Sequence, residues 1–217
     1  MTSNQITNSY LQVTSAGAYH CSSSAKQDNA QNFIAYLLSC NESPRLSDDL
    51  LTAHLHEKLS TANTLIKHMY SLGWLERTDT QATARLESLE DLLPQLLPSL
   101  AAEGKAMLSD AQGFYISSTG FPHETAEELA ALGADLNSLQ ERHRGLVSKN
   151  LSLTTSNWSL VDAGGYSRLG FWPIHINNEI FTLIISGPPR LEHPDFLALT
   201  WALFVRYSST TPKMYTQ

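Results

Sequence analysis

One short apolar segment restricts the architecture of this chain more than any other feature. Residues 180–185, with the sequence IFTLII, are nearly all apolar and rich in β-branched side chains. Such a segment is typical of a buried strand in the middle of a sheet. Asn177 and Asn178 precede it and suit a tight two-residue hairpin turn, because asparagine tolerates positive φ. The sequence therefore predicts a sheet with this segment at its centre.

Four further segments have the pattern of strands. In residues 105–120, KAMLSDAQGFYISSTG, two short strands enclose a turn in which Asp110 and Gly113 lie three residues apart. That spacing favours a type I turn followed by a glycine in the left-handed region. Residues 158–161 and 166–176 are predicted to be the next two strands.

Helical patterns alternate with these strands. Residues 85–100 are rich in leucine, but Pro94 and Pro98 must bend or interrupt a helix there, since each removes a helical hydrogen bond. Residues 125–128, TAEE, have the T-x-x-E pattern of a capping box. They predict a long helix over residues 126 to about 147. The small side chains in its middle would let another element approach it closely.

The resulting order is helix, two strands, long helix, three strands and a last helix opened by Pro194. This order resembles the Roadblock/LC7 family of small dimerising modules. The resemblance covers residues 84–208 and rests on the hairpin AMLSDAQGFYISSTG, the helix TAEELAALGADL and the strand EIFTLIISG. It implies a five-stranded antiparallel sheet with the hairpin at one edge and the long helix on one face.

The resemblance also implies that two copies pair through the long helix and the third strand. The small residues at 130–134, AALGA, would suit close contact between two helices, although the same band could pack on its own sheet. The candidate dimer or partner contacts are Ala130, Ala131, Gly133, Ala134, Asn137, Arg142, Arg144 and Trp158.

The preceding part of the chain reads as three helices and a short strand. The first helix is AQNFIAYLLSC, the second follows Ser47, the third begins after Ser60 or Thr61 and ends at Gly73, and the strand covers residues 74–77. This order resembles the winged-helix family. The prediction is therefore an α+β chain with a winged-helix-like domain before the Roadblock/LC7-like domain.

A winged helix can bind DNA or dock onto protein, and both remain open. In the DNA-binding alternative, the third helix would present Thr61, Asn63, Thr64, Lys67 and His68 to phosphates and base edges. However, residues 28–80 hold seven acidic residues and four Lys or Arg residues. An excess of three negative charges does not favour a DNA-binding surface.

The chain divides into four predicted regions. These are a flexible polar arm at 1–27, the winged-helix-like domain at 28–80, the Roadblock/LC7-like domain at 84–208 and a tail at 209–217. The formal net charge of −7 does not indicate an anionic partner such as nucleic acid or an acidic membrane. Cys21 and Cys40 are expected to be free thiols in a reducing compartment. Without a signal-peptide pattern or a long apolar span, we expect a cytoplasmic protein.

Motifs for chemistry are missing from the sequence. It contains no G-x-S-x-G nucleophile elbow, no GxxxxGK[ST] or GxGxxG phosphate loop and no H-E-x-x-H metal motif. His54 and Glu57 share a helical spacing but are more typical of a solvated face. We therefore expect no catalytic residue, metal or cofactor. A pocket that gathered His175, Asp162 and Tyr166 would favour an enzyme instead.

The predicted function is that of a non-catalytic cytoplasmic adaptor or regulator. The resemblance implies a homodimer that acts through protein contacts, often on a small Ras-like GTPase or a motor-like assembly. The alternative is a transcriptional regulator that binds DNA through its first domain and dimerises or senses a signal through its second.

Overall fold

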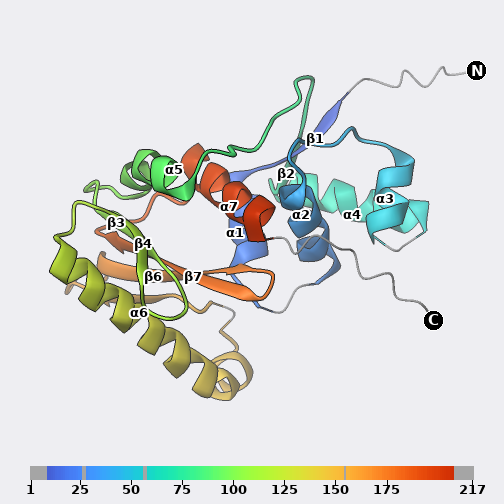
Figure 1. The fold of residues 1–217 in the computed structure, drawn as a ribbon. Helices are drawn as coiled ribbons and strands as arrows, with labels where there is room; N and C mark the ends of the chain where they lie inside the picture. Colours follow the sequence, from blue (N-terminus) through green and yellow to red (C-terminus); the bar gives the residue numbers. More distant parts are fainter. Residues whose placement is uncertain (1–8, 26–27, 56–57, 154, 208–217) are drawn as a thin grey trace, which may run out of the picture.

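The computed structural model describes residues 9–25, 28–55, 58–153 and 155–207 (Figure 1). The second half of the chain forms a five-stranded antiparallel sheet in the order β4-β3-β7-β6-β5. Its strands are β3 (Ala106–Ser109), β4 (Tyr115–Thr119), β5 (Trp158–Val161), β6 (Ser167–Ile176) and β7 (Glu179–Ser186). The predicted α+β class and the Roadblock/LC7-like order of elements are confirmed.

The apolar segment at 180–185 lies at the centre of this sheet, as predicted. Strand β7 pairs with β3 along one edge and with β6 along the other. Leu183, Ile184 and Ile185 are fully buried, because helices cover both faces of the strand. Asn177, in the turn before β7, has a φ of 54°.

The predicted hairpin at 105–120 is also confirmed, with β4 at the edge of the sheet. The Asp110 Oδ1 atom accepts hydrogen bonds from the backbone N–H groups of Gln112 and Phe114, both at 2.9 Å. Gly113 has a φ of 89°, a conformation that an L side chain rarely adopts. The turn therefore fixes the register of β3 against β4.

Helix α6 (His123–Arg142) packs on one face of the sheet, over β4, β3 and β7 (Figure 1). The predicted capping box was wrong, because the helix begins two residues before Thr125, with Pro122 as its N-cap. Helix α6 is also shorter than predicted. A turn interrupts it after Arg142, and a π-helix, η2 (Gly145–Asn150), follows.

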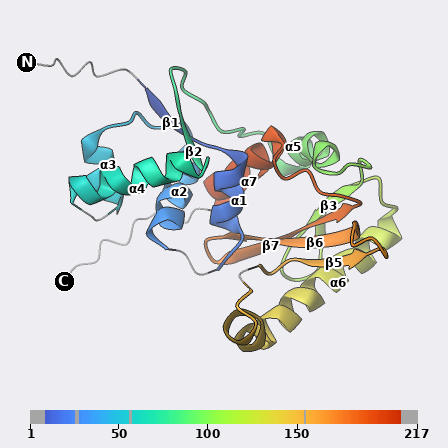
Figure 2. The ribbon, with the colours of Figure 1, turned by 180° about the vertical axis from the view of Figure 1, so that it is seen from behind.

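Several helices cover the opposite face of the sheet (Figure 2). They are α1 (Ser15–Ser22), α5 (Leu89–Leu96), the 3₁₀ turn η1 (Leu97–Leu100) and α7 (Pro194–Tyr207). The predicted effect of the prolines is confirmed, since Pro94 lies inside the short α5 and Pro98 lies in η1. The Ser88 side chain caps α5 by accepting from the N–H of Asp91.

The predicted three helices and strand of residues 28–80 are present. They are α2 (Asn29–Ser39), α3 (Asp48–Leu55), α4 (Leu59–Ser71) and β2 (Leu75–Thr78). Gly73 follows α4 with a φ of 69°, as expected of a glycine at a helix end. Strand β2 pairs with β1 (Tyr10–Val13), which precedes all these helices in the chain. The winged-helix assignment therefore stays a prediction.

The predicted flexible arm at 1–27 was wrong for residues 10–22, which form β1 and α1. This short stretch has only two large aliphatic side chains, Leu11 and Val13, and both are buried, as is Cys21. Burial raises the pKa of the Cys21 thiol to about 12, and both cysteines are free. Residues 1–8 and the predicted tail lie outside the described residues.

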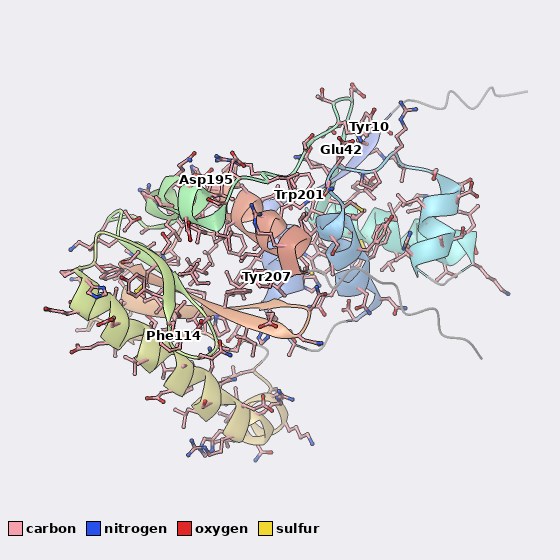
Figure 3. All side chains as sticks on the ribbon, in the orientation of Figure 1. Tyr10, Glu42, Phe114, Asp195, Trp201 and Tyr207 are labelled. Atoms are coloured by element: carbon pink, nitrogen blue, oxygen red, sulfur yellow. The ribbon has the colours of Figure 1, made fainter. Side chains whose placement is uncertain are left out.

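One continuous hydrophobic core joins the first part of the chain to the second. Helices α1 and α2 both pack against α7. The indole N–H of Trp201 in α7 donates to the carbonyl of Cys40 at 2.8 Å (Figure 3). The Ser15 hydroxyl donates to the carbonyl of His193 at 3.1 Å. The division into domains at 28–80 and 84–208 stays a prediction, and these contacts tie the two parts together.

Candidate functional site

Helix α6 lies over one half of its sheet, above β4, β3 and β7. Ala126, Ala130 and Gly133 are buried and face the sheet. A Cβ atom at Gly133 would lie 3.4 Å from the Thr182 methyl group and 3.5 Å from Ile184 Cδ1. The helix therefore packs closely on its own sheet through small residues.

The hairpin turn occupies one flank of α6. A Cβ atom at Gly113 would lie 3.2 Å from the Cα of Ala131 and 3.5 Å from the Cβ of Ala134. The Asn137 side chain donates to the Thr182 hydroxyl at 2.8 Å and so also fastens α6 to β7. The AALGA band thus contacts its own sheet and hairpin, and Ala131 is its exposed small residue.

The other flank of α6 carries a row of leucines. Leu129, Leu132, Leu136 and Leu139 recur three and four residues apart, so they lie on one side of the helix. At 3.6 residues per turn, this side is opposite the flank that holds Ala131 and Ala134. Leu132 is 42% exposed, and the other three leucines are half-buried. The leucines therefore face the β6–β5 half of the sheet, which α6 leaves uncovered.

Strand β5 continues this apolar area. Its four residues are all exposed, with Leu160 at 63% and Trp158 at 37%. Trp158 pairs with Phe171, and Leu160 pairs with Leu169. Because Phe171 and Leu169 belong to the cluster beneath α6, their cross-strand neighbours point to the same face.

We call this area the β5–α6 surface, made of Leu132, Leu136, Leu139, Trp158 and Leu160. Strand β5 pairs with β6 on one edge, and its other edge has no strand partner in the described part of the chain. Unpaired strand edges and contiguous exposed apolar side chains are both typical of association surfaces. Of the predicted contacts, Trp158 lies on this surface, and Arg142 is exposed at the end of α6.

The leucine row had a signal in the sequence. A helix that lies on one sheet needs one apolar stripe, whereas α6 has a stripe of small residues and a second stripe of leucines. Which of the two faces the sheet depends on how closely the backbones approach, and the spacing of residues does not give that distance.

The candidate nucleic-acid contacts all lie on the solvent face of α4. Thr61, Asn63, Thr64, Lys67 and His68 are exposed, whereas Ala62, Ile66 and Met69 face the core. The structure thus places these five side chains together, with Lys67 as the one Lys or Arg among them.

The three residues whose clustering would have favoured an enzyme lie at opposite ends of β6. His175 lies near the end of that strand, whereas Asp162 and Tyr166 belong to the turn before it. The Asp162 Oδ1 atom accepts from the backbone N–H of Gly164 at 2.9 Å, so its role is in the turn. His54 stacks on Tyr36 with 3.5 Å between ring centres, and Glu57 lies outside the described residues.

The described residues contain neither a metal-binding cluster nor a membrane-spanning helix. No group of three or more His, Cys, Asp or Glu side chains is placed to hold a metal ion in residues 9–25, 28–55, 58–153 and 155–207. Within the same ranges, every helix is too short or too polar to cross a membrane.

No protein-family model matches this sequence. The 3-phosphoshikimate 1-carboxyvinyltransferase of Geobacillus kaustophilus (strain HTA426) is 26% identical over 136 residues, which cover 58% of this chain and 30% of that enzyme. The chain thus spans less than a third of the length of this relative.

Two solved structures are similar to this chain. The Roadblock/LC7 domain from Streptomyces avermitilis has 16% sequence identity and a TM-score of 0.37, covering 55% of this chain and 93% of that domain. Myxococcus xanthus MglB has 14% identity and a TM-score of 0.36, covering 61% of this chain and 99% of MglB.

Proposed function

We propose that this chain is a non-catalytic adaptor or regulator that acts through protein–protein contacts as a homodimer. The observation that supports it is the β5–α6 surface, where a strand with four exposed residues lies beside a row of leucines. An exposed apolar strand edge is an aggregation hazard unless another chain covers it. A second copy of the same surface would cover it in a closed and symmetric way.

In the proposed dimer, the β5 strands of two copies pair antiparallel about a two-fold axis. The two sheets then continue into one another, and the leucine rows of the two α6 helices meet above the junction. Leu132, Trp158 and Leu160 become buried against their counterparts. Of the candidate contacts, Ala131 and Arg142 lie exposed on α6, outside the leucine row, and are proposed as outer contacts to a further protein.

Sedimentation of purified protein tests the dimer. We expect the unmodified chain to sediment as a dimer and Leu160→Lys to sediment as a monomer, because a charged side chain would be buried without a partner. Leu86→Lys is the matched control, since Leu86 is 56% exposed and lies outside the β5–α6 surface. A monomeric unmodified chain, or a Leu160→Lys dimer of unchanged affinity, would contradict this proposal.

The partner we propose is a small Ras-like GTPase or a motor-like assembly, as the Roadblock/LC7 resemblance implies. Affinity capture from nuclease-treated native lysate, with GTP analogue or GDP added in parallel, tests this step. Retention of a GTPase in one nucleotide state supports it. Capture of a motor component would support the motor-like alternative. Equal recovery of a GTPase in both nucleotide states, or recovery of neither a GTPase nor a motor component, contradicts the proposal.

DNA binding is the second candidate, favoured by the five exposed polar residues of α4. If α4 binds phosphates, Lys67→Gln should weaken binding to labelled duplex DNA and reduce the salt slope of log K by about one. Lys105→Gln, which alters a lysine just before β3, is the control. Binding that is undetectable at low salt, or equally weakened by both variants, counts against this candidate.

A further inference from the structure

A cleft with a mixed polar and apolar lining lies at the C-terminal end of α6. Four segments build it: the loop after α1, the last turn of α6 with the π-helix η2, the chain before β5, and β6 through His175. Its volume is about 460 Å³. This is within the range of about 300–1,000 Å³ that is typical of small-molecule sites.

Apolar atoms make up the larger part of the lining, but the cleft also carries two cationic side chains and several hydroxyl groups. Arg144 and Lys149 come from the α6–η2 segment, and the imidazole of His175 comes from β6. The hydroxyl groups are those of Ser23, Ser24, Ser148, Thr155 and Ser156. Glu141 is the one carboxylate in the lining and is ion-paired with Arg144. Lys149 has no ion pair within the described residues, so the cleft has an excess of positive charge.

Two irregularities of the chain lie in the lining of this cleft, and a third, at Ser152, lies next to it in the sequence. The six residues of η2 form a π-helix, a rare element that is frequent at functional sites. Ser152 has a φ of 54°, which is uncommon for a residue other than glycine. The Ser156 hydroxyl is buried and has no hydrogen-bond partner, although buried polar groups are nearly always satisfied. A ligand that accepts a hydrogen bond from Ser156 would supply the partner that this hydroxyl lacks.

We propose that this cleft binds a small soluble molecule that carries a phosphate monoester. A phosphate group has three acceptor oxygens and close to two negative charges at neutral pH. Arg144, which is also paired with Glu141, and Lys149 would neutralise these charges. The unpaired hydroxyl of Ser156 would donate to one of the remaining oxygens, whereas the Ser148 hydroxyl already donates to the Arg144 carbonyl at 2.7 Å.

His175 fits the same ligand. Burial lowers the pKa of its imidazole, and the nearby Arg144 lowers it further, whereas Glu141 acts in the opposite direction. A neutral imidazole keeps one N–H donor for a ligand oxygen or hydroxyl. The volume that remains beyond the phosphate leaves room for a small organic group.

Calorimetric titration of the full chain tests the proposal. The probes are inorganic phosphate and glycerol 3-phosphate at constant ionic strength and neutral pH, with sodium sulfate as a second anion. We expect saturable binding of one glycerol 3-phosphate per chain, weakened about tenfold or more by Arg144→Gln and by Lys149→Gln. Arg190→Gln is the matched control because Arg190 is exposed and lies outside the cleft, and it should leave the affinity within about twofold.

Three outcomes would overturn the proposal. The first is the absence of saturable heat with either phosphate up to about 10 mM. A dissociation constant above that concentration is far too weak for a functional site. The second is equal weakening by Arg190→Gln or equal binding of sulfate, which would indicate a general charge effect. The third is Arg144-dependent binding only to vesicles that contain phosphatidic acid, which would assign the cleft to a lipid headgroup. Thermal stabilisation of the unmodified protein by glycerol 3-phosphate gives a readout that does not depend on whether the variants fold.

Discussion

Gly17 in α1 shows how one residue can hold two distant segments together. Its N–H is capped by the Thr14 hydroxyl at 3.1 Å, and the N–H of Thr14 donates to the Trp74 carbonyl at 3.0 Å. A Cβ atom at Gly17 would overlap the carbonyl group of Trp74 and lie 3.1 Å from its Cα. Glycine is therefore needed for close approach here, and its backbone has an ordinary helical conformation.

Gly17→Ala is accordingly expected to destabilise the protein by about 1–3 kcal/mol, the usual range for overpacking. Without the contact, alanine in a helix would be more favourable than glycine by about 1 kcal/mol. The measurement is the free energy of unfolding in urea. Gly145→Ala is the control, because a Cβ atom there would have nothing within 4 Å. A Gly17→Ala protein as stable as the unmodified chain would show that β2 moves easily away from α1.

His175 makes the stability depend on pH. Its folded-state pKa is lowered by burial and by Arg144, so the unfolded chain takes up its proton at a higher pH than the folded chain. The free energy of unfolding should therefore fall as the pH drops below about 6.5, the unperturbed histidine value. The Glu141 carboxylate opposes this effect only in part.

His175→Gln should lose less stability between neutral pH and about pH 5 than the unmodified chain does. Urea unfolding at several pH values measures the difference. His68→Gln changes an exposed histidine on α4 and serves as the comparison. Equal acid sensitivity of the His175→Gln variant and the unmodified chain would mean that other groups cause the loss.

The β3–β4 hairpin shows how a single turn fixes an element. Asp110→Ala removes the acceptor for the N–H groups of Gln112 and Phe114 and should cost about 1–2 kcal/mol of stability. Asp135→Ala, an exposed aspartate of α6, should change stability by less than about 0.5 kcal/mol. Chemical unfolding of both variants compares them. If both lose the same small amount, Gly113 alone determines the turn.

Local patterns were sufficient for most elements of the sheet. The apolar run of β7 and the Asp–Gly spacing of the hairpin both follow from preferences of neighbouring residues. Strand β1 could not be predicted in this way, because it has only two buried apolar residues and its partner is β2, far along the chain. Its stability comes from contacts that no short window of sequence contains.

The β5–α6 surface could be predicted only in part from local sequence patterns. The sequence indicated that residues 158–161 form a strand, and the family resemblance implied that α6 contacts a partner. The pattern left open whether the small-residue band packs on its own sheet, as Ala130 and Gly133 do, and it did not show that the leucine row would be left over. Which stripe faces inward is decided by the close approach of α6 to β7, including the Asn137–Thr182 hydrogen bond. That approach is a property of the whole packed layer.

At the scale of the whole molecule, the continuous core predicts a single unfolding transition. The contact of Trp201 with Cys40 and the packing of α2 on α7 link the two predicted domains. Separate unfolding would expose this shared apolar surface, which is unfavourable at about 25 cal/mol for each Å². Tryptophan fluorescence and far-ultraviolet circular dichroism should therefore report coincident transitions in urea.

Trp201→Leu sharpens this test, because it removes the indole N–H and part of the packing between α7 and α2 while it keeps an apolar side chain. We expect a loss of about 2–4 kcal/mol in one transition that remains cooperative. Leu86→Ala, at a residue that is 56% exposed and outside the β5–α6 surface, is the control and should alter stability far less. If the fluorescence and circular dichroism transitions occur at different urea concentrations in the unmodified protein, residues 28–80 unfold on their own. The prediction of a single unfolding transition is then wrong.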